Sequence, residues 1–442
     1  MAQGFKPVEN KFSAKCLKQT QLGEFIENRV NDFLRKKDCN TVRVHIRVVS
    51  SSDKFTQVKD LMRKKYFDKD DWSDKIPYRS KTILAFTEIN RFDVCFFGFY
   101  VQEYGTNSSF LNSRCVYLSY LDSVNFFSPK KYRTDVYHEI LLGYMNYVKL
   151  MGFVKVYIWA CPPLKDSDYI FHRHPNNQKV PTQKRLQTWY NRLFKKGSNE
   201  LIVTSFKNIF DQAKEDNFKS ATELPYFEGD FWPNVIEESI KEIEMEQQNQ
   251  MQAKLQLDEY VSNSDVSLCP SLFEKENATF METTMFKSLV NNWHFQQWEQ
   301  ELTAKLYAAM EKHKDVYFVV CLNNAGSANL PPISDPDDII NCDLMDGRDA
   351  FLMMAREKHY EFSSLRRAIF STMALLYELH NGTNKCLRKD GYSCNNCQRC
   401  ITEPRYHCLE CDDFDLCSNC FTTVGHNHRV EKYKCNINVG KL

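Results

Sequence analysis

The chain has 442 residues, of which 43% are hydrophobic and 26% charged, and its 58 Lys and Arg residues against 57 Asp and Glu residues leave a formal net charge of +1. One hydrophobic core rarely grows beyond about 250 residues, so this length predicts two or three domains, and the composition excludes a chain that is disordered throughout. The near-neutral charge argues against a protein whose main function is to bind nucleic acids, because such a protein needs an excess of basic residues.

Apolar runs predict β-strands along the first 160 residues. Between residues 42 and 48 every second residue is Val or Ile, a period of two that is typical of a half-buried strand. Further apolar and aromatic runs predict strands over 82–86, 94–101, 115–121, 154–160 and 316–322.

Apolar stripes at helical spacing predict helices between and after these strands. Val136, Ile140, Tyr144 and Val148 predict one helix, with Thr134 as its N-cap. Other helices are expected over 184–197, 200–216, 234–247 and 298–313, with long helices over 348–380.

Two segments lack such periodicity. The polar segment 245–290 is expected to be an excursion or a partly ordered loop, and 381–393 to be a linker. Because helices and strands intermingle up to residue 380, we expect one α/β domain followed by a small appended module.

The N-terminal sequence MAQGFKPVENK has no apolar signal-peptide core, and the apolar run over 94–101 is far shorter than the ~20 residues that span a bilayer. We therefore expect an intracellular protein that does not interact with membranes. In a reducing compartment, a dense Cys/His segment indicates metal binding rather than disulfides.

Nine of the seventeen cysteines lie between Cys386 and Cys435. Three Cys-x-x-Cys pairs and a closing His-x-His supply eight donors, enough for two tetrahedral zinc ions: Cys394, Cys397, Cys408, Cys411, Cys417, Cys420, His426 and His428. The segment is too short for a hydrophobic core, so the metals must supply its folding energy. The alternative is that these cysteines are scattered on the surface without a metal. The regular spacing of four pairs of donors, the His-x-His pair included, argues strongly against it.

Two quieter features are candidates for a ligand site. Arg133 and Thr134 lie where a helix begins, and a helix N-terminus favours phosphate, although an ordinary capped helix is the more common explanation. Aromatic, proline and basic residues also crowd after the strand over 154–160, where α/β proteins place ligands. The simplest interpretation of Tyr190 in that cluster is an aromatic residue of the hydrophobic core. Two histidines alone, His172 and His174, are weak evidence for a metal site.

Long motifs resemble a known family. They include FFGFYVQEYG, YLSYLDSVNFF, YRTDVYHEILLGY, IWACPP, DYIFHRHP, TELPYFEGDFWPNV and CDLMDGRDAF. They resemble the acetyltransferase domain of the CREB-binding-protein family of transcriptional coactivators. The resemblance runs from about residue 11 to 430 and implies an acetyltransferase domain over 11–380, with 245–290 as a variable region, and a ZZ-type zinc finger over 389–435. The implied fold is a central mixed β-sheet flanked by helices, with a small cross-braced finger.

The resemblance implies a histone and protein lysine acetyltransferase that uses acetyl-CoA as its co-substrate. It makes Tyr190 the general acid and Trp159 the residue that positions the substrate lysine. The residues it implies for acetyl-CoA are Leu121, Asp122, Ser123, Arg133, Thr134, Gln178, Lys179, Val180, Arg185 and Trp189. Arg133 and Thr134 would then meet the phosphates, in agreement with their place at a helix N-terminus.

A shallow acidic rim for the protein substrate is also implied by the resemblance. Its residues would be Ser80, Tyr120, Glu228, Asp346 and Asp349, with Ser80 in place of the family's threonine. Acidic residues steer basic histone tails towards the site. Without the resemblance, the simpler interpretation of Asp346 is an acidic residue near a helix N-terminus, where it interacts favourably with the helix dipole, rather than a substrate contact. The implied partners are histone tails and other lysine-rich nuclear proteins, with transcription factors or chromatin complexes, and the implied location is the nucleus.

The order of the metal ligands resembles that of ZZ-type fingers, whereas a RING-type ubiquitin ligase does not end in His-x-His. The resemblance implies interleaved sites, one with Cys394, Cys397, Cys417 and Cys420, the other with Cys408, Cys411, His426 and His428. Both zinc ions would be structural, Cys400 would be a spare thiol, and Asp412, Asp413 and Asp415 would be candidate contacts for a basic peptide, or only solubilising acids.

The chain departs from the family in its length and in residues 245–290. No acetyl-lysine reader or activator-docking module is visible. The family's regulatory loop is rich in lysine, whereas 245–290 contains three lysines and seven acidic residues, so self-inhibition by a basic loop is not expected. Two other functions stay open: a catalytically weak paralogue that acts as a CoA- or histone-binding adaptor through its finger, and a nucleic-acid binder. The basic run over 63–65 is weak support for the latter, and no direct DNA binding is expected.

Overall fold

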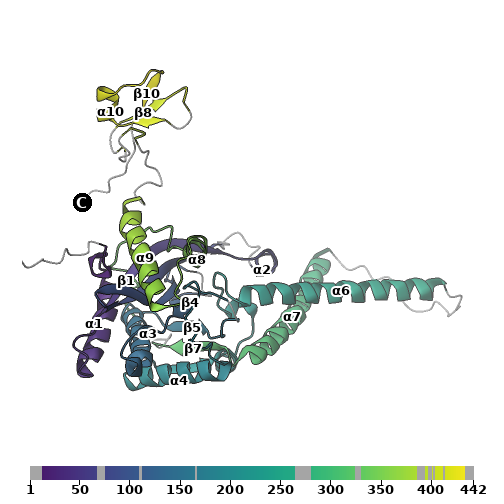
Figure 1. Cartoon of the computed structure of the whole chain (residues 1–442). Helices are drawn as coiled ribbons and strands as arrows, with labels where there is room; N and C mark the ends of the chain where they lie inside the picture. The colour runs from purple at the N-terminus through teal and green to yellow at the C-terminus, as the bar shows by residue number, and fades with distance from the viewer. Residues whose placement is uncertain are drawn as a thin grey trace, which may run out of the picture.

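The computed structural model describes residues 12–66, 75–108, 112–164, 167–263, 280–323, 330–385, 394–396, 401, 404–411 and 414–433. A seven-stranded sheet forms the centre of the larger part of the chain (Figure 1). Its strands are β1 (Val44–Gln57), β2 (Lys75–Ile89), β3 (Phe92–Tyr104), β4 (Cys115–Ser123), β5 (Lys155–Trp159), β6 (Ser205–Asn208) and β7 (Tyr317–Cys321).

The strand order is β1-β2-β3-β4-β5-β7-β6. Only the β4–β5 pair is parallel, with Cys115 opposite Lys155 and Leu118 opposite Ile158, and the other pairs are antiparallel. The predicted mixed sheet is therefore confirmed, and each strand expected from an apolar run is present.

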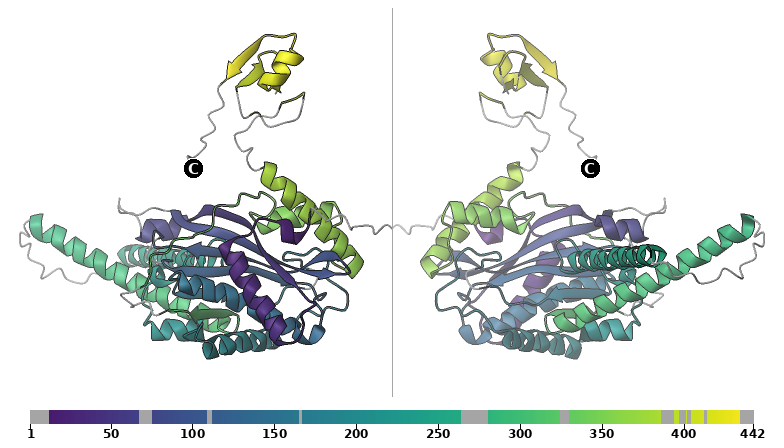
Figure 2. Two further views of the ribbon diagram at one scale, coloured as in Figure 1. Left: turned by 90° about the vertical axis from the view of Figure 1, so that its left-hand side faces the viewer. Right: turned by 90° about the vertical axis from the view of Figure 1, so that its right-hand side faces the viewer.

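Helices flank the sheet. They are α1 (Gln21–Lys36), α2 (Asp60–Tyr66), α3 (Arg133–Leu150), α4 (Gln183–Asn199), α5 (Ile209–Glu215), α6 (Trp232–Asn263), α7 (Phe280–His313), α8 (Arg348–Glu357) and α9 (Leu365–Lys385). Two side views show helices packed along the sheet and α6 and α7 reaching out from it (Figure 2).

Two hydrophobic cores lie on opposite faces of the sheet. Along β7, Phe318 and Val320 belong to one core while Tyr317 and Val319 belong to the other, as the alternation of strand side chains requires. The first core includes side chains of α1, α3, α4 and α9, and the second those of α5, α6 and α7.

Two predictions about helices need correction, and one helix was missed. Thr134 does not cap α3, because the helix already begins at Arg133 and Tyr132 precedes it without a side-chain cap. The helix expected over 200–216 is shorter: Ser205–Asn208 pairs with β7 as an edge strand, and α5 begins only at Ile209 with Asn208 as its cap. Pairing with a sheet edge thus overrides a helical pattern. Helix α1, capped by Thr20, was not among the predicted elements.

Segment 245–290 is mostly helical where it is described. Helix α6 continues to Asn263 and α7 begins at Phe280, so the expected loop is wrong for these residues, while 264–279 lies outside the described ranges. Lys305 of α7 forms ion pairs with Glu242 and Glu246 of α6, at 3.1 and 3.3 Å. Helix α9 likewise extends to Lys385, into the expected linker, and 386–393 lies outside the description. A search of the described helices finds none with the length and apolarity needed to cross a bilayer.

A buried charge cluster fixes the segment that follows residue 330 to the sheet. The Lys81 ammonium, 1% exposed, lies 2.8 Å from Glu103 Oε2 and 2.7 Å from Asp335 Oδ2. Burial would lower the pKa of Lys81, but the charges of Glu103 and Asp335 outweigh burial and raise it. Two residues further on, Asp337 accepts hydrogen bonds from the first two backbone N–H groups of α1, at 2.6 and 3.0 Å.

Replacing Lys81 by methionine should lower the free energy of unfolding by about 3–5 kcal/mol, because the buried Glu103 carboxylate would lose its cation and keep the hydrogen bond from Tyr144. Asp335 would retain Arg79 as its cation. Denaturant unfolding of the wild type and the variant measures this difference. Lys18→Met is the matched control, since its ion pair with Asp338 is exposed and such pairs contribute less than about 1 kcal/mol. A Lys81 variant as stable as the control would contradict the expected role of the cluster.

Candidate acetyl-CoA and lysine site with a two-metal finger

A cavity of about 1730 Å³ opens at the carboxyl ends of the parallel strands β4 and β5. Strand ends of this kind commonly form ligand sites in α/β proteins. Loop 167–181, helix α4 and residues 228–234 complete its walls. The predicted residues that line it are Tyr120, Leu121, Asp122, Ser123, Thr134, Trp159, Gln178, Lys179, Val180, Arg185, Trp189, Tyr190 and Glu228. Arg133, Ser80, Asp346 and Asp349 are not among its lining residues.

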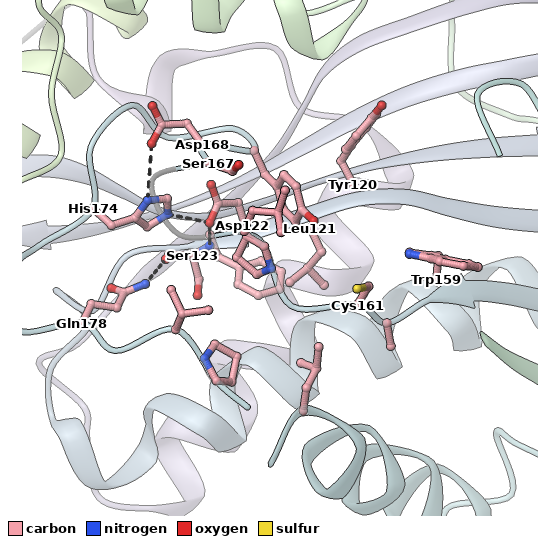
Figure 3. Close-up of a pocket in the computed structure, with 18 of the residues that line it drawn as sticks. Tyr120, Leu121, Asp122, Ser123, Trp159, Cys161, Ser167, Asp168, His174 and Gln178 are labelled. Atoms are coloured by element: carbon pink, nitrogen blue, oxygen red, sulfur yellow. Dashed lines mark hydrogen bonds and ion pairs between the residues drawn. The ribbon is translucent and has the colours of Figure 1, made fainter. Parts of the chain in front are cut away.

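Asp122 anchors loop 167–178 to the end of β4 (Figure 3). Its Oδ2 atom accepts hydrogen bonds from the backbone N–H groups of Ile170 and Phe171, at 2.9 and 3.0 Å. Its Oδ1 atom lies 2.7 Å from His174 Nε2, and His174 Nδ1 lies 3.9 Å from Asp168. The two carboxylates and the imidazole between them therefore give this wall of the cavity a fixed shape.

The same loop closes against β4 at Ser123. Gln178 Nε2 donates to the Ser123 carbonyl oxygen at 2.7 Å, which holds the backbone at Lys179 and Val180 along the cavity. Val180 lines the cavity with its side chain 51% exposed.

Arg133 supports the cavity from its side. Its guanidinium donates to the Asn125 carbonyl oxygen at 2.6 Å, and Asn125 in turn donates to Asn177 at 3.0 Å. Thr134 itself lines the cavity in the first turn of α3, where backbone N–H groups and the helix dipole favour an anion. The structure thus brings Thr134 into the cavity and leaves Arg133 beside it.

Helix α4 presents Arg185, Trp189 and Tyr190 to the cavity. Thr182 caps the helix by accepting from the Arg185 backbone N–H at 3.4 Å. The Trp189 ring packs edge-on against His138 and Tyr190, with ring centroids 4.5 and 4.9 Å away. These contacts fix the orientation of the indole.

Tyr190 is 4% exposed and packs between Phe194 and Phe318, at centroid distances of 5.8 and 5.7 Å. Burial, with a smaller contribution from Tyr169, raises the pKa of its hydroxyl. Among the described residues no group forms a hydrogen bond with that hydroxyl. It is therefore a protonated donor whose hydrogen remains available to a ligand.

Trp159 ends β5, on the other side of the close-up from His174 (Figure 3). Its ring packs against Phe231, His313 and Tyr317, with centroids 5.0, 5.7 and 5.7 Å apart. Tyr190 and Trp159 thus line one cavity, although one lies on a helix and the other at a strand end.

The predicted acidic rim is only partly within the cavity. Tyr120 and Glu228 line it, whereas Asp346 pairs with Lys54 at 3.0 Å and Asp349 with Arg348 at 3.0 Å. The Arg348 guanidinium lies 4.6 Å from the Tyr120 ring centroid, so this pair adjoins the cavity. Ser80 lies opposite Ser52 across the β1–β2 pair, and Ser52 donates a hydrogen bond to Asp346.

The cysteine-rich segment has a three-stranded sheet and one short helix. These are β8 (Arg405–Cys408), β9 (Asp415–Leu416), β10 (Val430–Tyr433) and α10 (Ser418–Thr423). Its buried core among the described residues consists of Cys394, Ile401, Leu416 and Cys420, two of which are candidate ligands.

The candidate ligands gather into two groups, Cys408, Cys411, His426 and His428 in one and Cys394, Cys417 and Cys420 in the other, each with donor atoms within 4.8 Å of one another. Cys397 lies outside the described residues, as do Cys400, Asp412 and Asp413. Sulfur-to-nitrogen distances in the first group run from 3.1 to 3.8 Å. Tetrahedral zinc with usual bond lengths requires about 3.6 Å, so this donor set fits the ion.

Asp415 has a different role from the predicted peptide contact. It is 3% exposed, and its carboxylate lies 2.9 Å from His407 Nδ1 and 3.5 Å from Arg405, while its backbone carbonyl oxygen accepts a hydrogen bond from the Asn395 N–H. A carboxylate held inside the finger in this way cannot reach a peptide, so its function is structural.

Comparison with known proteins gives two matches along the chain. Residues 30–334 match the family model of a histone acetyltransferase domain, KAT3, and residues 388–430 match that of a ZZ-type zinc finger. The chain belongs to the KAT3 histone acetyltransferase family.

Two relatives illustrate the extent of the similarity. Protein cbp-1 of Caenorhabditis elegans is 43% identical over 452 residues, which cover 100% of this chain and 22% of that protein. Histone acetyltransferase HAC12 of Arabidopsis thaliana is 34% identical over 489 residues, covering 94% of this chain and 28% of that protein. The chain thus spans less than a third of the length of either relative.

The KAT3 domain contains cavity residues that the sequence reasoning missed or set aside. Asp168 and His174 were not assigned to the site, yet they hold its loop, and Asp230 lines the cavity with its carboxylate buried. Tyr117 and Tyr317 donate hydrogen bonds to Asp230 at 3.0 and 2.8 Å, and burial raises its pKa to about 6. The acidic and histidine residues of DYIFHRHP offered a signal, because a carboxylate close to two imidazoles often orients them.

Replacing His174 by glutamine in the KAT3 domain should change how stability depends on pH. Burial lowers the pKa of His174, but its hydrogen bond to Asp122 and the charges of Asp122 and Asp168 outweigh burial, so the pKa is raised above 6.5. The stabilisation, about 1–2 kcal/mol, is then complete below pH 6.5 and is lost as the pH rises through the raised pKa. The difference in melting temperature between wild type and variant should shrink from pH 6 to pH 9.

His359→Asn serves as the control for this series, because His359 is exposed and its φ of 54° suits asparagine. Its melting temperature should stay at a constant offset from the wild type. A constant offset for His174→Gln as well would contradict the pH-dependent role of the imidazole.

Proposed function

We propose that the protein is a histone and protein lysine acetyltransferase that transfers the acetyl group of acetyl-CoA to lysine side chains. The observation that carries the proposal is that one cavity of a KAT3 domain is lined by both Tyr190 and Trp159 and by the residues expected for acetyl-CoA. We further propose that it acts in transcriptional coactivation in the nucleus, on histone tails and other lysine-rich nuclear proteins.

In this proposal the chain divides into an acetyltransferase domain over 11–380 and a ZZ finger over 389–435. The adenine and phosphate end of acetyl-CoA would lie against the N-terminus of α3 and the side chains of Arg185 and Trp189. The pantetheine arm would follow Leu121–Ser123 and the loop at Gln178–Val180. The place of this loop in the cavity lining and the 2.7 Å hydrogen bond between Gln178 and Ser123 support an arm that lies along it.

The proposed reaction needs a neutral lysine amine and a proton for the leaving thiolate. The amine nitrogen bonds to the acetyl carbon and loses a proton to water, the carbon–sulfur bond breaks, and the thiolate takes a proton from the Tyr190 hydroxyl, which water then reprotonates. The lysine, whose usual pKa is near 10.4, gives up its own proton to water before attack. Trp159 would hold the aliphatic stem of the lysine, and its own packing against Phe231 and Tyr317 supports that role. Orientation of the two reactants supplies much of the acceleration.

The finger is proposed to bind two structural zinc ions and to contact the basic N-terminal segment of a histone tail or a similar peptide. The zinc supplies folding energy and no chemistry, because all four positions of each ion would be taken by protein ligands. We expect no direct binding of DNA and no membrane partner.

Transfer of label from acetyl-CoA to histones H3 and H4 tests the proposal. Purified protein is incubated with labelled acetyl-CoA and histones, beside Tyr190→Phe and beside a sample without histone, while CoA binding is measured by calorimetry. Label on histone lysines above the level of the variant supports the enzyme. CoA binding without such transfer would overturn it and favour an adaptor that acts through the finger.

A further inference from the structure

The carboxylate of Asp346 is already occupied by groups of the same chain. Its Oδ2 atom lies 3.0 Å from the Lys54 ammonium, which also donates to the Asp346 carbonyl oxygen at 2.5 Å. Its Oδ1 atom accepts a hydrogen bond from Ser52. Both oxygens of this predicted substrate contact are therefore engaged before any substrate arrives.

The pair lies on the surface that leads to the cavity. Lys54 is opposite Tyr78 in the β1–β2 pair, and Tyr78 packs on Tyr104 at a centroid distance of 5.2 Å. The Tyr104 hydroxyl accepts a hydrogen bond from the backbone N–H of Glu228 at 3.2 Å. Burial raises the pKa of Tyr78, and the charges of Glu228 and Asp346 raise it further, so both carboxylates lie near this buried ring.

The other two acids of the rim, Asp349 and Glu228, differ in whether a cation of the same chain already pairs with them. Asp349 pairs with Arg348, whose guanidinium also covers the Tyr120 ring. Glu228 is exposed, and within the described ranges its carboxylate has no ion pair. Of the three acids, Glu228 is therefore the one whose negative charge no described cation neutralises.

We infer that Lys54 is a specificity-determining residue, an internal cation that occupies Asp346 and competes with basic side chains that flank the substrate lysine. The inference rests on the proposed acetyl transfer to lysine. A substrate with one basic neighbour uses Glu228 and meets no competition. A second basic neighbour has to displace the Lys54 ammonium from Asp346. The Lys54–Asp346 ion pair therefore limits how much more tightly the rim binds a substrate with several basic neighbours than a substrate with one.

Lys54→Met tests this inference, because methionine keeps the apolar stem and removes the charge. Two fluorescent lysine peptides serve as probes, one with neutral flanks and one with two flanking arginines on each side. The variant should bind the arginine-flanked peptide about two- to fivefold more tightly than the wild type and the neutral peptide equally well. Raising the salt from 50 to 200 mM should shrink the gain, and KM for transfer should fall in parallel with kcat unchanged.

Four further variants make the result specific. Lys54→Arg should behave like the wild type, and Lys305→Met should show no gain, since it removes an ion-paired surface lysine on α7 outside the cavity lining. Asp346→Asn alone should weaken binding of the arginine-flanked peptide, because it leaves the Lys54 ammonium unneutralised, and in a Lys54→Met background it should cancel the gain.

Unchanged or weaker binding of the arginine-flanked peptide by Lys54→Met would overturn the inference. So would an Asp346→Asn change that leaves the gain intact in the Lys54→Met background. Because binding is measured apart from turnover, the two proposals fail separately. A gain in binding without any acetyl transfer would overturn the proposed enzyme and leave the role of Lys54 intact, whereas transfer with no gain would overturn only the latter.

Discussion

Replacing Tyr190 by phenylalanine should lower the rate constant of acetyl transfer by about 10²-fold or more, the usual contribution of a positioned general acid. The change deletes one oxygen atom from a ring that is 4% exposed and held between Phe194 and Phe318. The ring should therefore stay in place. The thiolate of CoA would instead have to leave unprotonated or take a proton from water.

The environment of Tyr190 suits a donor rather than a base. Burial raises the pKa of the hydroxyl above its ordinary value of 10.0, so it remains protonated through the neutral range. We accordingly expect that no loss of rate between pH 7 and pH 9 arises from ionisation of Tyr190. Any rise in rate over that interval follows deprotonation of the substrate lysine, whose pKa is near 10.4.

Single-turnover transfer to a histone H3 peptide, with acetyl-CoA bound in advance, measures this effect apart from product release. Tyr147→Phe is the matched control, because Tyr147 is also a buried tyrosine, on α3, but does not line the cavity, and its rate should match the wild type. CoA affinity should be the same in all three proteins. A Tyr190 variant within threefold of the wild type rate would contradict the assignment of the general acid.

The sheet was predictable from the sequence because its strands carry their own pattern. The alternation over 42–48 and the apolar runs that become β2 to β5 need no partner to be recognised. The edge strand β6 was not, because Ser205–Asn208 has no apolar run and forms a strand only through its bonds to β7. Helices α6 and α7 were underestimated because a long, polar helix has little apolar periodicity along its exposed part.

The cavity was predictable only in part. Strand ends and crowded aromatic residues pointed to the right region, and the resemblance supplied the individual side chains. Partners far apart in the chain could not be read from the sequence: Asp122 and His174 are 52 positions apart, and Lys54 and Asp346 are 292 apart. Sequence shows that Asp346 is acidic, but only the fold shows that its charge is already paired.

The finger is the opposite case, since its ligands could be read directly from their spacing. Removing zinc should unfold it while the acetyltransferase domain stays folded. Its described core has only four buried residues, two of them cysteines, and its helix α10 has six residues. A structural zinc ion contributes about 10–16 kcal/mol in such small domains, far more than this core can supply.

Chelation followed by hydrogen exchange should therefore expose the amides of residues 404–433 and leave those of the seven-stranded sheet protected. Elemental analysis should give two zinc ions per chain before chelation. Finding one ion per chain, or a finger that stays protected after complete removal of zinc, would contradict the proposed metal sites. Cys16→Ser, at an exposed cysteine outside the finger, should retain both ions.

Replacing His428 by alanine should release both zinc ions, although only one of them is proposed to bind it. The two ligand groups alternate along the chain: Cys394 belongs to one, Cys408 and Cys411 to the other, Cys417 and Cys420 to the first again, and His426 and His428 to the second. Loss of the second ion frees β8 at Cys408, and β8 is the central strand that pairs with both β9 and β10. Strand β9 immediately precedes Cys417, so the first ion then loses the scaffold that holds two of its ligands.

Zinc release from this variant, followed with a colorimetric chelator, should proceed in one cooperative phase that accounts for two ions. Release of one ion with the other retained would show that the sites fold independently, and the interleaved order would then have no energetic consequence.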